Sequence, residues 1–360
     1  MDSKKRGYFV LNAEDRSLVL HIGSPKAGST SLQNFLMSNR AALNGQDFQY
    51  QDMEDANKDW RIHRGLTGGD IWNPIYPKAD GLIALDETQF DMFERVLALS
   101  VNQLKDYKSI ILSNEFLYFI AKDPKFWKLL NSFQEVMNVK IRIFLYLRSP
   151  FDFLRSWYSE SIKRGFTLEN FSDYLSNPNQ IFDSVYSDLP CLISLAAENC
   201  FEFDIFNLST IGQNISSHFS QAIGFDLRDS KLGPDANTGL NAIELEFFRG
   251  VHVVSRKLGL ILCNERTDIY LSNLNPSKAN LTFKQQISQV SCDLIFEKLQ
   301  TLNLELSNLH PTLDELIYDV PPEFTSTQPN FYMDEALRAA YEVGLMLGRS
   351  YVGGYLKRDT

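Results

Sequence analysis

The sequence is poor in the features that mark secreted, membrane-bound and metal-binding proteins. Its four cysteines, Cys191, Cys200, Cys263 and Cys292, show no CxxC pair or other metal-ligand spacing, so we interpret them as reduced thiols. No apolar run approaches the roughly 20 residues of a membrane-spanning helix, and the polar N-terminal residues contain no signal-peptide segment. We therefore expect a cytoplasmic protein with no membrane span and no bound metal.

Positive charge is scarce as well. The chain has 35 Lys and Arg against 45 Asp and Glu, a formal net charge of −10. Nonspecific binding to nucleic acid or to an acidic membrane needs a broad basic surface, so we expect neither partner. The 360 residues are 44% hydrophobic and 22% charged, which is typical of a folded globular protein. We expect one domain over residues 1–360, with a cofactor-binding core at about 16–210 and a helical part at about 211–360.

One segment, Leu18–Gln33, combines a strand, a loop and the start of a helix. The apolar run Leu18–Gly23 is typical of a buried strand. A loop containing Lys26 and Gly28 follows, and the hydroxyl run Ser29–Ser31 opens a helical pattern. The first N–H groups of a helix have no partner within it, and the helix dipole favours negative charge there. The segment therefore predicts an anion site, with phosphate as the expected ligand.

The position of the lysine separates two kinds of phosphate loop. Gly23 and Gly28 have the spacing of a Walker A loop, but Ser29 stands where that loop has its lysine. The lysine of this chain, Lys26, comes two residues before Gly28 instead. The resulting Pro-Lys-x-Gly-[Ser/Thr]-[Thr/Ser] arrangement resembles the 5′-phosphosulfate loop of sulfotransferases that use 3′-phosphoadenosine 5′-phosphosulfate (PAPS).

A second motif follows another predicted core strand, Val139–Leu147. Arg148 leaves the end of this strand, Pro150 suits the first turn of a helix, and Ser156 comes eight residues after Arg148. A guanidinium group offers forked donors to phosphate, and a serine hydroxyl adds one more. The spacing resembles the Arg and Ser that hold the 3′-phosphate in the same sulfotransferases. The alternative is an Arg that binds backbone carbonyls at a strand end, with Ser156 on a helix surface.

A third motif lies between these two. The apolar run Ile110–Leu112 predicts a strand that stops in the polar residues Ser113, Asn114 and Glu115. In parallel α/β sheets, ligands bind at the carboxyl ends of strands, which would bring Glu115 close to the other two motifs. It resembles the Ser-x-Glu element of glycan-modifying and bacterial sulfotransferases, whose Glu is a candidate base. The alternative is a carboxylate that only stabilises the start of the following helix.

Together these motifs resemble the PAPS-dependent sulfotransferase family over about residues 18–160. The resemblance implies a P-loop nucleotide-kinase-like fold, with a three-layer parallel β-sheet flanked by helices. It implies catalytic roles for Lys26 and Glu115, with PAPS as the sulfuryl donor and no metal. The residues expected to bind PAPS, or its product 3′,5′-adenosine bisphosphate, are Lys26, Ala27, Gly28, Ser29, Thr30, Ser31, Arg148 and Ser156.

Strands that alternate with helices also predict an α/β fold with a parallel sheet. We expect strands at 18–23, 110–112, 139–147 and 201–206. Helical spacing is present at 88–106, 116–137 (with a break near residues 123 and 124), 154–163, 168–175, 186–198 and 211–223. Further helical patterns at 240–257, 283–306 and 335–347 predict a helix-rich C-terminal half.

The acceptor is expected to be a small molecule or glycan, most simply through a carbohydrate hydroxyl. Arg61, His63 and Arg64, beside Trp60, form a basic aromatic segment that could bind an acidic sugar. The alternative is a solvated surface loop. Two other functions remain open: a P-loop nucleotide or small-molecule kinase, and a nucleotide-binding protein without catalysis. The position of Lys26 and the lack of an obvious Walker B aspartate argue against the kinase.

Overall fold

The computed structural model describes the part of the chain that carries the first three motifs. The described residues are 16–51, 87–163, 167–169, 174, 185–186, 188–199, 201–208, 211, 214–229, 245, 248–250, 252–253, 297–298, 300–302, 304–306 and 309. The chain divides into two compact units: residues 1–149, 183–237 and 302–318 form the first, and residues 150–182, 238–301 and 319–360 form the second. The expected single domain with a boundary near residue 210 stays a prediction.

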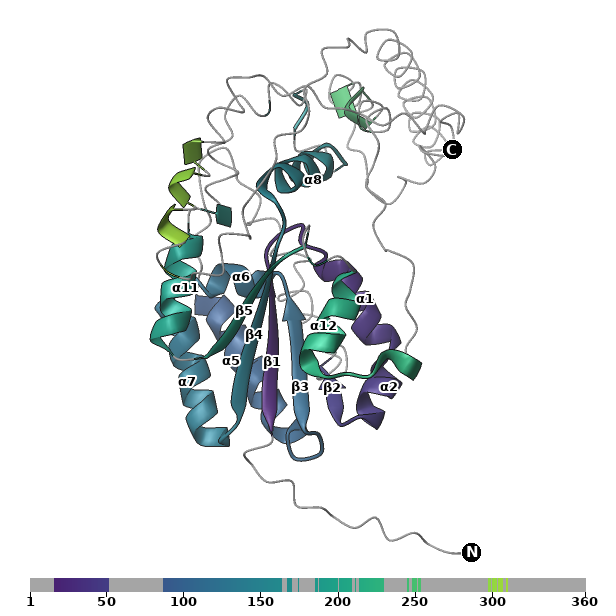
Figure 1. The fold of residues 1–360 in the computed structure, drawn as a ribbon, viewed down its shortest axis with the longest axis vertical. Coiled ribbons are helices and arrows are strands. Elements are labelled where there is room, and N and C mark those ends of the chain that lie inside the picture. Colours follow the sequence, from purple (N-terminus) through teal and green to yellow (C-terminus); the bar gives the residue numbers. More distant parts are fainter. Residues whose placement is uncertain are drawn as a thin grey trace, which may run out of the picture. The chain divides into compact units, whose positions relative to one another are not determined.

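The first unit is built on a five-stranded, all-parallel sheet (Figure 1). Its order is β2-β3-β1-β4-β5, so β1 has a neighbour on each side. The strands are β1 (Ser17–Gly23), β2 (Phe48–Tyr50), β3 (Ser109–Asn114), β4 (Lys140–Leu147) and β5 (Glu202–Asn207). The predicted α/β class with a parallel sheet and flanking helices is therefore confirmed.

The register brings the ends of the three central strands together. Ile22 in β1 lies opposite Asn114 in β3, and Gly23 lies opposite Tyr146 in β4. Glu115 and Arg148 come directly after the ends of β3 and β4. The carboxyl edge of the sheet thus holds the residues that follow all three strands, which is where parallel α/β sheets bind ligands.

One face of the sheet is covered by α1 (Ser29–Ser38), α2 (Arg40–Gly45) and α12 (Ile215–Ile223) (Figure 1). The central strands are buried on both faces, and because successive side chains of a strand point to opposite faces, every second side chain meets these helices. The core on this face contains Val19, Ile111, Phe144 and Tyr146 from the strands, and Leu32, Phe35, Leu36, Leu43, Phe219 and Ile223 from the helices. This core fixes the direction in which α1 leaves the loop after β1.

The helices α5 (Glu87–Gln103), α7 (Pro124–Met137) and α11 (Leu189–Glu198) cover the other face (Figure 1). Trp127 of α7 is fully buried, contacts the ring of Phe203 in β5 edge-on, and donates a 2.7 Å hydrogen bond to the Ala121 carbonyl. Asp123 caps α7 by accepting a hydrogen bond from the Lys125 N–H, which explains the predicted helix break there. The short helix α6 (Phe116–Ile120) precedes that break.

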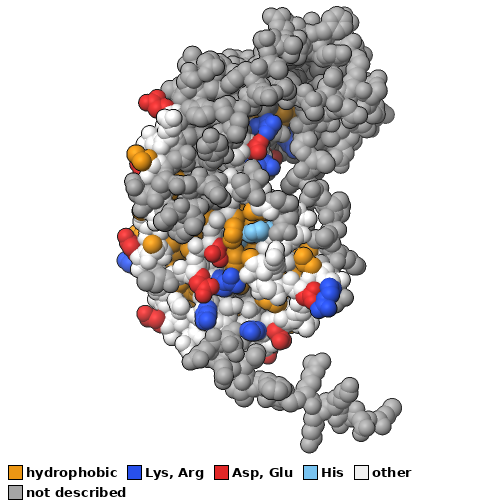
Figure 2. All heavy atoms as spheres, viewed as in Figure 1, with side chains coloured by type: hydrophobic (Ala, Val, Ile, Leu, Met, Phe, Trp, Pro, Cys, Tyr) orange, Lys and Arg blue, Asp and Glu red, His pale blue; other side chains and the backbone are white. Residues whose placement is uncertain are grey.

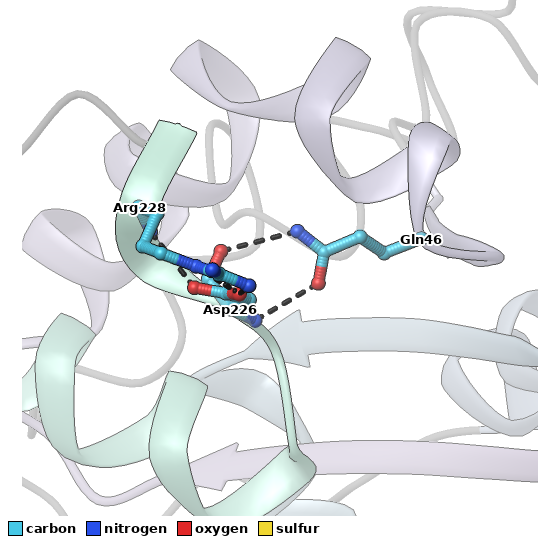
Figure 3. Close-up of polar contacts among 3 residues, drawn as sticks. All are labelled: Gln46, Asp226 and Arg228. Carbon is cyan, nitrogen blue, oxygen red and sulfur yellow. Dashed lines mark hydrogen bonds and ion pairs between the residues drawn. The ribbon is translucent and has the colours of Figure 1, made fainter.

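A side-chain amide joins the end of α2 to the segment after α12. The Gln46 Nε2 donates to the Asp226 carbonyl at 3.1 Å, and the Asp226 N–H donates to the Gln46 Oε1 at 2.9 Å (Figure 3). Arg228, in the 3-10 helix Leu227–Asp229, binds the Asp226 carboxylate and lowers its pKa. The side-chain amide of Gln46 thus pairs with the backbone of Asp226 as another peptide group would, and connects two segments that are far apart in the sequence.

In the second unit, α8 (Pro150–Lys163) begins at the proline that the sequence marks as a helix start. Tyr158 donates a hydrogen bond to the Glu169 carbonyl at 3.1 Å, and Arg249 donates one to the Leu168 carbonyl at 3.3 Å. Most of the predicted helix-rich C-terminal half lies outside the described residues. Within the described ranges, no helix has the length and apolar character required to cross a membrane.

Candidate functional site

The loop between β1 and α1 is held against the neighbouring strand β4. The Ser24 hydroxyl donates to the Tyr146 carbonyl at 3.0 Å, and the Ala27 N–H donates to the Ser24 carbonyl at 3.2 Å. Two residues of the loop have positive φ, Lys26 at 63° and Gly28 at 80°. Glycine adopts that conformation freely, whereas an L-residue such as lysine is strained in it. The loop therefore keeps a lysine at a position where the backbone favours glycine.

The two glycines of the loop are favoured for different reasons. At Gly23 a β-carbon would lie 3.1 Å from the His21 Cε1 and 3.3 Å from the Ser29 Cβ, so the His21 and Ser29 side chains would have to give by a few tenths of an ångström. At Gly28 a β-carbon would meet Ile215 at 3.5 Å, an ordinary contact. Gly28 is therefore favoured for its left-handed backbone, and Gly23 for close packing.

The start of α1 is suited to an anion. Gly28 is its N-cap and has no side chain that could accept from the first-turn N–H groups, and the first turn contains no acidic residue. Ser29 is buried, Ser31 is half-buried, Thr30 is exposed, and Lys26 is half-buried in the loop beside them. Free N–H groups, the helix dipole and hydroxyl donors all favour negative charge here. The predicted phosphate loop thus has its expected strand–loop–helix geometry.

Glu115 reaches this loop from the neighbouring strand. It follows the last residue of β3, is half-buried, and its Oε1 accepts a hydrogen bond from the Ser29 hydroxyl at the first residue of α1. The contact joins two residues that the sequence predicts for the site from separate motifs. A carboxylate next to a phosphate-type loop can accept a proton from a hydroxyl group bound there.

The other predicted site residues are the two expected ligands of the 3′-phosphate and the expected substrate segment. Arg148 is half-buried directly after β4, and its carbonyl accepts a hydrogen bond from the Tyr186 hydroxyl. Ser156 is half-buried in α8, which belongs to the second unit. Their pairing around a 3′-phosphate stays a prediction. The predicted substrate segment, Arg61, His63 and Arg64, lies outside the described residues.

Charged side chains are mixed on the visible surface of the described residues. Figure 2 shows Lys and Arg side chains next to Asp and Glu side chains, not gathered into one basic field. Selectivity for an anion at the loop therefore has to come from local donors, namely Lys26 and the start of α1. Among the described residues, no group of three or more His, Cys, Asp and Glu side chains is arranged to hold a metal ion.

His21 lies beneath the loop and has no exposed surface. Its Nδ1 is 2.7 Å from the Ser113 hydroxyl, and its ring contacts those of Tyr146 and Phe219 edge-on. Its Nε2 is buried and has no hydrogen-bond partner. Burial lowers the pKa of His21 from its ordinary 6.5 to about 3, because the charged imidazolium would lose its hydration. His21 is therefore neutral in the folded protein.

This burial predicts a loss of stability in acid. Since the unfolded chain takes up a proton on His21 near pH 6.5 and the folded chain does so only near pH 3, stability falls as the pH drops below 6.5. Between pH 7.5 and pH 5 the loss from this group is about 2 kcal/mol. Urea unfolding at several pH values measures this loss: the free energy of unfolding of the wild type should fall by about 2 kcal/mol more between pH 7.5 and pH 5 than that of His21→Gln. An equal pH dependence in the two proteins would refute the buried, neutral state.

Sequence reasoning missed Gln33, a polar residue next to the site. The Gln33 Nε2 donates to the Ser113 carbonyl at 3.1 Å, and Ser113 also contacts His21. The available signal is the spacing of Ser29 and Gln33, which are four residues apart and lie on the same side of a helix. Both side chains of α1 are directed to the end of β3.

Comparison of the whole chain with protein-family models, curated proteins and solved structures gives no match. The resemblance to PAPS-dependent sulfotransferases therefore depends on the sequence motifs.

Proposed function

We propose that this protein is a PAPS-dependent sulfotransferase with a P-loop nucleotide-kinase-like fold, acting on a hydroxyl group, most simply of a carbohydrate. The observation that carries the proposal is the contact between Ser29 and Glu115. It joins a candidate base to the first residue of the helix that follows a phosphate-type loop. A loop that only binds a nucleotide does not need a carboxylate at this place, whereas sulfuryl transfer to a hydroxyl needs a proton acceptor.

In the proposed reaction the acceptor oxygen forms a bond to sulfur as the bond from sulfur to the bridging oxygen of the 5′-phosphate breaks. Glu115 takes the proton of the acceptor hydroxyl. Negative charge grows on the departing phosphate, where Lys26 and the N–H groups at the start of α1 stabilise it. Arg148 binds the 3′-phosphate, which distinguishes the donor nucleotide from AMP and ATP. Atoms and charge balance with 3′,5′-adenosine bisphosphate and the sulfate ester as products.

The cofactor assignment predicts that a 3′-phosphate adds strongly to nucleotide affinity. We expect 3′,5′-adenosine bisphosphate to bind at least ~10-fold more tightly than AMP in calorimetry, which corresponds to about 1.4 kcal/mol for a charged contact. Arg148→Ala should remove that difference. Arg155→Ala is the matched control, because Arg155 is an exposed arginine that binds Asp152 within α8. Equal affinity of the wild type for both nucleotides would disprove the role of Arg148.

The reaction itself is tested with sulfur-labelled PAPS and a panel of glycans and small hydroxylated molecules. Transfer of label to an acceptor, with release of adenosine bisphosphate, is the expected result. A thermal-shift comparison that includes ATP separates the kinase alternative, since a kinase is stabilised by ATP more than by adenosine bisphosphate. If adenosine bisphosphate stabilises the protein but no label is transferred, the chain is a nucleotide-binding protein without catalysis, and the proposed enzyme activity is wrong.

A further inference from the structure

The end of β3 is held by two side chains from two different elements. The His21 Nδ1, in β1, lies 2.7 Å from the Ser113 hydroxyl. The Gln33 Nε2, in α1, donates to the Ser113 carbonyl at 3.1 Å. Ser113 is therefore fixed through its side chain on one side and its backbone on the other, only two residues before Glu115.

Helix α1 contacts the same strand end twice. Ser29 donates to Glu115, and Gln33, one helical turn further on, donates to Ser113. Residues four apart lie on one side of a helix, so both hydrogen bonds join the same side of α1 to β3. The helix that begins at the phosphate-type loop and the strand that delivers Glu115 cannot shift past one another without breaking these contacts.

Stability alone does not account for a histidine at this position. The His21 side chain is fully buried, and its Nε2 has no hydrogen-bond partner. A buried polar atom without a partner is unfavourable, whereas an apolar residue of similar size would pack between Tyr146 and Phe219 without that penalty. What only a side chain with a hydrogen-bonding atom can do here is hold the Ser113 hydroxyl.

We infer that Gln33 and His21 are positioning residues, which act through Ser113 to hold the Glu115 carboxylate against Ser29 at the start of α1. The role of Glu115 as a base rests on the proposed function. The hydrogen bonds that join Gln33 and His21 to Ser113 do not depend on it. Gln33 and His21 contact neither the loop phosphate site nor the acceptor in this assignment. Their loss should therefore change the chemical step and leave nucleotide binding almost unchanged.

The test compares Gln33→Met, which keeps the length of the side chain but removes the donor, with Asn34→Met on the exposed neighbouring position of α1. We expect Gln33→Met to lower kcat about 10-fold, with the Kd for adenosine bisphosphate within twofold of wild type. Asn34→Met should leave both values unchanged. His21→Asn, which retains a polar atom near the Nδ1 position, should keep more activity than His21→Leu.

A double-mutant cycle distinguishes positioning from a general loss of structure. If Gln33 acts through Glu115, adding Gln33→Met to Glu115→Gln should lower kcat no further. If the decrease in kcat of the double variant equals the product of the decreases in the two single variants, the inference is overturned. Ser113→Ala, which removes the hydroxyl that lies against the His21 Nδ1, runs the same cycle with Glu115→Gln for the His21 contact.

A second readout does not require activity. The carbon-13 signal of the Glu115 carboxyl group, assigned by its absence in Glu115→Gln, reports the surroundings of that group. It should move in Gln33→Met and in Ser113→Ala, and stay in place in Asn34→Met. An unchanged signal in the first two variants would overturn the positioning role. If the wild type transfers no sulfuryl group but the signal still moves in these two variants, the proposed function is refuted and the positioning role stands.

Discussion

Glu115→Gln is expected to lower turnover by 10²- to 10⁴-fold, the usual contribution of a positioned base. Glutamine keeps the shape of the side chain and can still bond to the Ser29 hydroxyl, but it cannot take a proton at neutral pH. The measurement is the steady-state rate of label transfer from PAPS, at saturating acceptor. The Kd for adenosine bisphosphate should stay close to wild type, because the substitution leaves Lys26, Arg148 and the N–H groups at the start of α1 unchanged.

Glu135→Gln serves as the control for this change, because Glu135 is a carboxylate near the far end of α7. It should leave the rate unchanged. If Glu115 only stabilised the start of α6, Glu115→Gln would lower the melting temperature slightly and keep full activity. That outcome would require a different base.

Lys26 is the second position with a large expected effect. Lys26→Ala and Lys26→Gly should both lower turnover by about 10²-fold or more, because each removes the positive charge beside the departing phosphate. The two variants should differ in stability. Lys26 has φ of 63°, so glycine relieves strain of about 1 kcal/mol that alanine keeps. Urea unfolding and label transfer measured on the same preparations separate the two effects.

This pair of variants separates charge from folding. Lys26→Gly is expected to be at least as stable as the wild type and nevertheless inactive. A stable Lys26→Gly protein that transfers label at the wild-type rate would contradict a role for the lysine charge. Equal stability of the alanine and glycine variants would contradict the strain at this position.

The sequence predicts most of the first unit because its strands are strongly marked. The runs that form β1, β3 and β4 are rich in Ile, Leu, Val and aromatic residues, and all three are confirmed to within two residues at each end. The Asp123 cap and Pro124 mark the break between α6 and α7. The strand–loop–helix unit around Gly28 is also confirmed, because a glycine in that loop and a hydroxyl run at a helix start are local signals.

Other features depend on contacts that no local pattern encodes. Strand β2 has only Phe48, Gln49 and Tyr50, too few residues to show alternation, and the short helix α2 before it was not predicted either. The contact of Ser29 with Glu115 requires β3 to lie beside β1, which is set by the order of strands in the sheet. Gln33 looks like an ordinary polar residue of a helix surface until that order is known.

The place of α12 in the fold has a consequence for synthesis on the ribosome. This helix covers the face of the sheet that presents Val19, Ile111 and Phe144, yet it follows all five strands in the chain. About 75 residues separate the end of β4 from the end of α12. At a synthesis rate of 5–20 residues per second, this part of the apolar face therefore stays exposed for roughly 4 to 15 s before α12 is made. A nascent chain stalled within this interval should therefore recruit chaperones.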